Sequence, residues 1–402
     1  MTARCGAHFE TVKSSGLLKA FEYQQAGEII FGNGRISEVG SLVSRHGRRC
    51  LVVSGPSEGA LRDLYPIVGD LLEHVGLDWE HFDGVRPNPT VDIVSTGAKL
   101  AKKFKADVVL GIGGGSSLDT AKAIAVEATH EGTSWDYRFF KQKPTSKTLP
   151  VITAGTTAGS GSQATQVAVI NNTVSRDKST LVSPHLIPRL AIVDPQLTLS
   201  VPSIVTATTG FDVFCHALES ILNPRSNAAS ELFAWEALRR VIRDLPTAVR
   251  EGANLAARAS MAWADTLAGM SICRAGVALP HGIAMAVGGM FPDTSHGLAL
   301  ASVYRACLEF TWESAVPVFA RLARLLEPNL ESVVASEAAA ASPGLLVKFM
   351  NEVGLTFSLK DFGISKGELP ALARQSMVLP DYANNPRVPS YDETLQIVGA
   401  SF

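Results

Sequence analysis

The sequence lacks the features that mark secreted, membrane-spanning or nucleic-acid-binding proteins. Its five cysteines are scattered among 402 residues without a C-x-x-C pair, which is typical of reduced thiols rather than of a disulfide framework. The formal net charge is −2 and no basic run occurs, which argues against nucleic acid or an anionic membrane as a partner. No apolar stretch reaches the length of a bilayer span, and residues 1–16 contain no apolar segment of signal-peptide length. We therefore expect a cytoplasmic protein without a membrane anchor.

The composition and the order of patterns predict two kinds of domain. Hydrophobic residues make up 46% of the chain and charged residues 18%, enough to fill sizeable cores. In the first half, short β-branched runs alternate with helical patterns, which predicts a mostly parallel sheet covered by helices. After Pro202, long Ala/Leu-rich helical patterns replace the strand signals. We predict an α/β domain over residues 1–199 and an all-helical domain over residues 200–402. The predicted strands lie within residues 49–54, 106–117, 149–162 and 189–195.

Two loops rich in glycine and small residues follow predicted strands. The first is GIGGGSS, in which Gly113, Gly114, Gly115 and Ser116 lead into the helix SSLDTAKAIAVEA. Glycines at a helix N-terminus let the backbone N–H groups approach a phosphate, but they also suit a simple tight turn. The second loop is GTTAGSGSQ, residues 155–163. Because loops after parallel strands gather at one edge of the sheet, two such loops favour a dinucleotide over a single phosphate.

A set of one acid and three histidines indicates a metal site in the second domain. Asp212 and His216 are four residues apart in an apolar helical run, so their side chains are neighbours on one helix face. A bracing Asp–His pair is the simpler explanation when the two are taken alone. His281 and His296 lie in the apolar stretch PHGIAMAVGGMFPDTSHG and would be ~22 Å apart on a straight helix. Gly288-Gly289 and Pro292 can break that helix and allow all four side chains to converge on Fe²⁺ or Zn²⁺. Each histidine taken singly is also explained as a buried core residue.

Seven segments along nearly the whole chain carry a resemblance to the iron-containing (group III) alcohol dehydrogenases. They are PNPT (87–90), GGGSSLDTAKAIA (113–125), TTAGSGSQAT (156–165), IVDPQLT (192–198), TGFDVFCHALES (209–220), PHGIAMAVGGMFPDTSHG (280–297) and NNPR (384–387). The resemblance implies a dehydroquinate synthase-like fold, with the active site between a dinucleotide-binding α/β domain and a helical domain. It implies that Asp212, His216, His281 and His296 hold the metal. The cofactor-binding residues that it implies are Asn88, Gly114, Gly115, Ser116, Asp119, Thr156, Thr157 and Lys178. We predict that Gly55, Gly113 and Ser160 also bind the cofactor.

The chain departs from the family pattern at positions that bear on its chemistry. Many members have a further histidine between the last two metal ligands, where this chain has Met285 or Ala286. Gln163 replaces the usual glutamate in the second loop. Gly55 stands where NAD-specific members have an aspartate that repels a 2′-phosphate. We therefore expect NADP(H) to be accepted and slightly preferred over NAD(H), unless Gly55 serves only to form a turn with Pro56.

The expected reaction is hydride transfer between a small alcohol and its aldehyde or ketone, with a divalent metal polarising the oxygen. Fe²⁺ is the expected metal and Zn²⁺ the alternative, and a homodimer is usual in such families. A lyase related to dehydroquinate synthase is one alternative, but the stretch between the metal ligands lacks the lysines and arginines that its sugar-phosphate substrate requires. A non-catalytic protein that binds a dinucleotide and a metal is the other. Arg274 hints at an anionic substrate, but a surface or interdomain role is the better explanation of this arginine.

Overall fold

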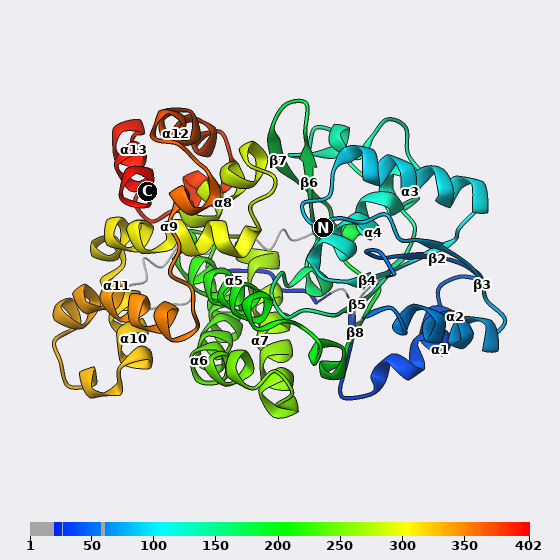
Figure 1. Cartoon of the computed structure of the whole chain (residues 1–402), viewed down its shortest axis with the longest axis horizontal. Helices are drawn as coiled ribbons and strands as arrows, with labels where there is room; N and C mark the ends of the chain where they lie inside the picture. The colour runs from blue at the N-terminus through cyan, green and yellow to red at the C-terminus, as the bar shows by residue number, and fades with distance from the viewer. Residues whose placement is uncertain (1–19, 26, 58–60) are drawn as a thin grey trace, which may run out of the picture.

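A computed structural model describes residues 20–25, 27–57 and 61–402. Its first half contains a six-stranded sheet in the order β1-β8-β5-β4-β2-β3, in which every neighbouring pair is parallel. The strands are β1 (Glu28–Phe31), β2 (Arg49–Val53), β3 (Asp78–Phe82), β4 (Val108–Gly113), β5 (Val151–Gly155) and β8 (Leu190–Val193). Figure 1 shows this sheet and its helices on one side of the molecule and the helical half on the other.

The sheet separates two hydrophobic clusters because successive strand residues point to opposite faces. Along β2, Leu51 and Val53 join the cluster that contains α3 and α4, whereas Cys50 and Val52 join the cluster that contains α1 and α2. These helices are α1 (Val39–Val43), α2 (Leu64–His74), α3 (Val91–Phe104) and α4 (Gly115–Glu127). Strands buried on both faces consist of continuous apolar residues, and for this reason β2 and β4 could be predicted from the sequence.

A separate antiparallel hairpin lies outside the main sheet. It consists of β6 (Val167–Asn172) and β7 (Asp177–Val182). Backbone atoms of β7 approach the last turn of a helix in the second half: a Cβ placed on Gly289 would lie 2.8 Å from the amide nitrogen of Lys178. The hairpin therefore packs directly on the helical domain, and glycine is required at this contact.

The second half is helical throughout its described residues, and its helices bury one large core. The helices are α5 (Ser203–Leu222), α6 (Ala228–Arg250), α7 (Leu255–Ala275), α8 (Leu279–Met290), α9 (His296–Thr311), α10 (Val316–Leu326), α11 (Ala335–Glu352), α12 (Leu369–Met377) and α13 (Tyr391–Ala400). The predicted fold class, a parallel α/β domain followed by a helical domain, is confirmed. The last strand ends at Val193 and α5 begins at Ser203.

Two details differ from the sequence-based expectation. Gly288 and Gly289 do not break the helix: α8 continues to Met290, and the chain turns through residues 291–295, which include Pro292. The edge strands β1 and β3 were not predicted, because EIIF and DWEHF are only partly buried and carry polar residues.

In the part of the chain that the structure describes, no single helix is long and apolar enough to cross a membrane. Together, α7 and α8 would reach the required length and hydropathy, but they meet at an angle of 99°.

Candidate metal centre

Helix α5 presents two of the predicted ligands and one residue that the prediction missed. Asp212, His216 and Glu219 are spaced i, i+4 and i+7, so they lie on one face of the helix. Asp212 is 7% exposed, His216 is 6% exposed and Glu219 is fully buried. Three polar side chains inside an apolar core require polar partners or an ion, and their surroundings supply polar partners.

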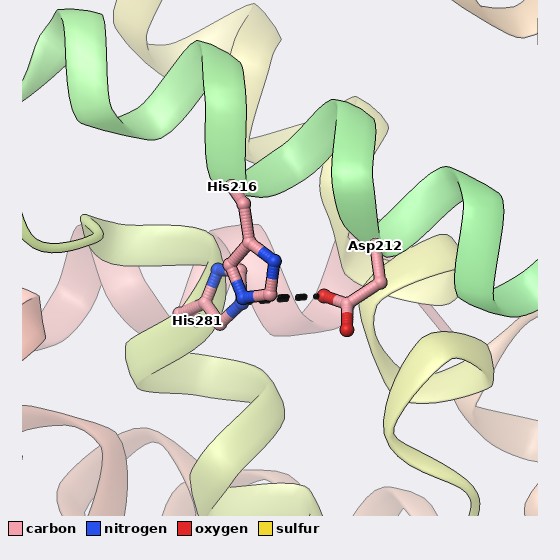
Figure 2. Close-up of side chains that lie close together, drawn as sticks. All are labelled: Asp212, His216 and His281. Carbon is pink, nitrogen blue, oxygen red and sulfur yellow. Dashed lines mark ion pairs between the residues drawn. The ribbon is translucent and has the colours of Figure 1, made fainter. Parts of the chain in front are cut away.

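The imidazoles of three histidines converge on one carboxylate oxygen. The Nε2 atoms of His281, His216 and His296 lie 3.4, 3.6 and 3.9 Å from Asp212 Oδ1. Figure 2 shows Asp212 and His216 projecting from the same helix toward His281, which comes from α8. Ligand atoms of Asp212, His216 and His281 all lie within 4.8 Å of one another. His296, the first residue of α9, completes the predicted set of four at a slightly greater distance.

The donor atoms of this cluster fit a divalent metal ion. Asp212 Oδ1 and His281 Nε2 are buried, and neither has a hydrogen-bond partner among the described residues. Burial alone would raise the pKa of Asp212, but the neighbouring imidazoles outweigh it and hold that pKa well below its ordinary range. Burial also lowers the pKa values of His216 and His296, which keeps both rings neutral. One carboxylate and three imidazoles are a donor set that suits iron or zinc.

His281 lies between two carboxylates. Its Nδ1–H donates to Glu219 Oε1 at 2.8 Å, while its Nε2 points to Asp212. Burial opposes a charge on this ring, but Glu219 and Asp212 outweigh burial and raise the pKa of His281 to about 10. A cation bound beside Asp212 would displace that proton, because a metal-binding imidazole must be neutral at the ligating nitrogen.

Two groups outside the ligand set orient the imidazoles of His281 and His216. Glu219 accepts the Nδ1 proton of His281, and its other oxygen accepts from the backbone N–H groups of Ala278 and His281 at the start of α8. The Nδ1–H of His216 donates to the carbonyl of Gly159 at 3.1 Å. A carboxylate that fixes the tautomer of a metal-binding histidine is a common supporting feature of metal sites. The i+7 spacing from Asp212 could have identified Glu219 in the sequence.

The two predicted phosphate-binding loops lie against each other at the carboxyl ends of neighbouring strands. Gly113 ends β4 with φ of 140°, a conformation that favours glycine, and its carbonyl accepts from the N–H of Thr156 after β5. A Cβ on Gly114 would lie 3.3 Å from Thr157 Oγ1, and one on Gly115 would lie 2.7 Å from the Cβ of Ser160. Ser116 lies in the first turn of α4. Gly55 follows β2, the next strand in the sheet.

The remaining three predicted cofactor residues already have protein partners. Asp119 accepts from Ser162 Oγ at 2.7 Å and from the N–H of Val169 at 3.0 Å. Lys178 donates from Nζ to Asn88 Oδ1 at 2.8 Å, and burial lowers the pKa of Lys178 to about 8. The structure thus brings Asn88 and Lys178 together.

Two further buried residues hold the second loop in place. Lys122 is fully buried and donates from Nζ to oxygens of Ser162, Thr165 and Val167. On the other side of the loop, Asp265 of α7 accepts from the N–H of Gly161 and from Nε2 of Gln163, each at 2.7 Å. Side chains of both domains therefore hold the loop, and its Gly159 carbonyl accepts a hydrogen bond from His216 of the metal centre.

Arg274 does not line the metal centre. Its guanidinium donates to the carbonyl of Gln24 at 2.6 Å. This contact favours the surface or interdomain role for Arg274, so the arginine carries no argument for an anionic substrate.

Comparison with known proteins gives the family. A family model described as "Iron-containing alcohol dehydrogenase" matches residues 26–195, and one described as "Fe-containing alcohol dehydrogenase family, C-terminal" matches residues 206–402. The chain belongs to the iron-containing alcohol dehydrogenase family. It is 31% identical to the 1,3-propanediol dehydrogenase of Citrobacter freundii over 96% of this chain and 99% of that protein.

Solved structures of the same family share the fold. An archaeal halo-thermophilic alcohol dehydrogenase from a Red Sea brine pool superimposes with a TM-score of 0.91 at 30% identity, covering 96% of this chain and 100% of that one. A sulfoacetaldehyde reductase from Bifidobacterium kashiwanohense in complex with NAD⁺ gives 0.81 at 26% identity, covering 95% and 98%. The main functional hypothesis is confirmed at the level of class: this is a nicotinamide- and metal-dependent alcohol dehydrogenase or aldehyde reductase.

Proposed function

We propose that this enzyme reduces a small aldehyde, and oxidises the corresponding alcohol, with Fe²⁺ held by Asp212, His216, His281 and His296. The observation that carries the proposal is the convergence of three imidazole Nε2 atoms within 3.9 Å of one buried carboxylate oxygen. A metal bound there supplies Lewis acidity toward a hydroxyl or carbonyl oxygen. The nicotinamide supplies the hydride.

The residues of the chain have separate tasks in this scheme. The glycines after β4 leave the N–H groups at the start of α4 open to a pyrophosphate, and the loop after β5 lies directly beside them. Met285, one turn after His281 on α8, is buried and apolar. Its thioether cannot transfer a proton. Neither can Ala286, so the proton must pass to water, to the cofactor ribose or to another side chain.

We propose a modest preference for NADP(H), and the support comes from Gly55. No carboxylate stands at this position to repel a 2′-phosphate. Among the described residues, a Cβ placed on Gly55 would meet only the carbonyl of Val85, at 3.7 Å. Ser54 does not contribute, because it is fully buried and its hydroxyl is bonded to His81 and to the carbonyl of Gly55.

We also propose a cytoplasmic homodimer. The cysteines that the structure describes, Cys50, Cys215, Cys273 and Cys307, are all free, which suits a reducing compartment. Among the described residues, strand β1 forms an edge of the sheet, and an edge strand is a site at which a second copy can add its own strand. A molar mass near 42.6 kDa in light scattering, the mass of one chain, would contradict the dimer.

The reaction is tested by following NADPH and NADH oxidation anaerobically after reconstitution with Fe²⁺. The assay uses a panel of neutral and anionic small aldehydes. We expect turnover with at least one neutral aldehyde, and faster turnover with NADPH. Loss of turnover in His281→Ala, while NADPH still binds, would support the metal assignment. Full activity of that variant would contradict it.

A further inference from the structure

In the part of the chain that the structure describes, the third histidine of the metal centre, His296, has no side-chain or carbonyl partner to orient its ring. Among the described residues, Nδ1 of His216 bonds to the Gly159 carbonyl and Nδ1 of His281 bonds to Glu219, whereas the buried Nδ1 of His296 has no hydrogen-bond partner. His296 is also the first residue of α9, directly after the connection 291–295. The position of its ring therefore depends on the backbone that carries it.

That backbone is held by Asn88, a residue of the first domain. Its Nδ2 donates to the carbonyl of Pro292 at 2.7 Å and to the carbonyl of Thr294 at 3.2 Å. Its Oδ1 accepts from Lys178 Nζ at 2.8 Å. An ammonium requires an acceptor and two carbonyls require a donor, so these three partners fix the orientation of the amide. One side chain thus joins the hairpin of the first domain to the connection that ends at His296.

The end of α8 is held by the same domain. The carbonyl of Gly288 would bond to the N–H of residue 292 in a continuing helix, but Pro292 has no N–H. Asn171 of β6 replaces that donor at 3.1 Å, and the guanidinium of Arg176 donates to the carbonyl of Met290 at 2.7 Å. Two of the carbonyls left open at this helix end are thus satisfied by side chains of the first domain.

We infer that Asn88 is a positioning residue for His296 and that, with Asn171 and Arg176, it forms an interdomain clamp that sets the affinity for the metal. The inference rests on the metal-binding function proposed above. It assigns Asn88 a role beyond contact with the cofactor, since the clamp is complete without a bound dinucleotide. Metal binding by the cofactor-free protein must then depend on Asn88.

The test measures Co²⁺ binding to the cofactor-free protein in competition with a chelator. Asn88 has φ of 53°, so Asn88→Gly removes the side chain without straining the backbone. We expect its Kd for Co²⁺ to rise ~10–100-fold, as when other supporting contacts of metal ligands are lost. Asn88→Asp keeps the acceptor for Lys178 but loses both donated bonds, and we expect a rise in the same direction. Unchanged Kd values in both variants would overturn the inference.

Three further variants separate the possible explanations. Thr157→Ala removes a predicted cofactor contact at a residue that is not part of the clamp, and we expect it to leave the Kd for Co²⁺ unchanged. If His281→Ala binds Co²⁺ as the wild type does, the metal site itself is wrong. If His281→Ala loses Co²⁺ while Asn88→Gly binds normally, only the clamp is wrong. Arg176→Asn is the substitute variant if Asn88→Gly fails to fold. Arg176 has φ of 52°, a backbone conformation that asparagine tolerates. We expect a smaller rise in the Kd for Co²⁺ than in Asn88→Gly. No rise in that variant would count against the clamp.

Discussion

Replacing Glu219 by Gln should disable the metal centre while leaving its shape intact. Glu219 receives three donors: the Nδ1–H of His281 at 2.8 Å and the N–H groups of Ala278 and His281 at 2.8 and 3.3 Å. A glutamine has one acceptor oxygen. If that oxygen serves the backbone groups, its NH₂ faces Nδ1, and the imidazole proton moves to Nε2, which is the nitrogen that must bind the metal.

The expected loss of metal affinity in Glu219→Gln follows from the change in the tautomer of His281. Loss of such a supporting contact weakens metal binding ~10–100-fold, which corresponds to about 1.4–2.8 kcal/mol. The assay is Co²⁺ binding to Glu219→Gln with the visible spectrum as a second readout, because its bands report the number of ligands. Glu219→Asp is the matched control: it keeps the charge but shortens the reach, and we expect an intermediate loss. Wild-type affinity in Glu219→Gln would refute the orienting role.

Three other predictions address the cofactor site and the loop between the domains. Gly55→Asp should lower kcat/KM for NADPH relative to NADH, since it restores a carboxylate where a 2′-phosphate would lie; an unchanged ratio would show that Gly55 does not select the cofactor. Lys122→Met should lower the free energy of unfolding in urea by at least ~2 kcal/mol, because it leaves several buried oxygens unbonded; an unchanged midpoint would refute this. Burial, opposed by Gln163 and Gly161, raises the pKa of Asp265 to about 7 from 3.8, so the folded protein holds a proton there that the unfolded chain releases, and stability falls as the pH rises between these values. Asp265→Asn should remove that fall in stability. The test is to measure the melting temperatures of the variant and the wild type between about pH 4 and about pH 7. Parallel curves for the two proteins would contradict the prediction.

The fold class was readable from the sequence because the central strands are buried on both faces. Residues 108–113 form an apolar run that ends in glycines, and α4 follows immediately. The edge strands β1 and β3 were missed because only one side of each is paired and their residues are half exposed. The helix break between His281 and His296 lies at residues 291–295, which include Pro292, whereas Gly288 and Gly289 belong to the last turn of α8 and serve close packing on β7.

The metal centre was partly readable for a similar reason. Asp212 and His216 are linked by helix periodicity, which is a local property, and Glu219 follows the same rule. The convergence of His281 and His296 depends on how α8 and α9 fold back, which periodicity does not encode. The Gly159 carbonyl could not have been predicted, because a backbone atom leaves no trace in residue type. Asn88 was assigned to the cofactor alone, since its contacts with Pro292 and Thr294 span more than 200 residues.

The central claim, a catalytic metal held by four side chains, is tested most directly by titrating the metal-free enzyme with Fe²⁺ under anaerobic conditions. The rate of NADPH oxidation with an accepted aldehyde is followed at each addition. We predict that activity rises linearly and saturates at one Fe²⁺ per chain, and that His281→Ala stays inactive throughout. Full activity of the metal-free enzyme in the presence of a chelator, or saturation that is unaffected by His281→Ala, would contradict this account.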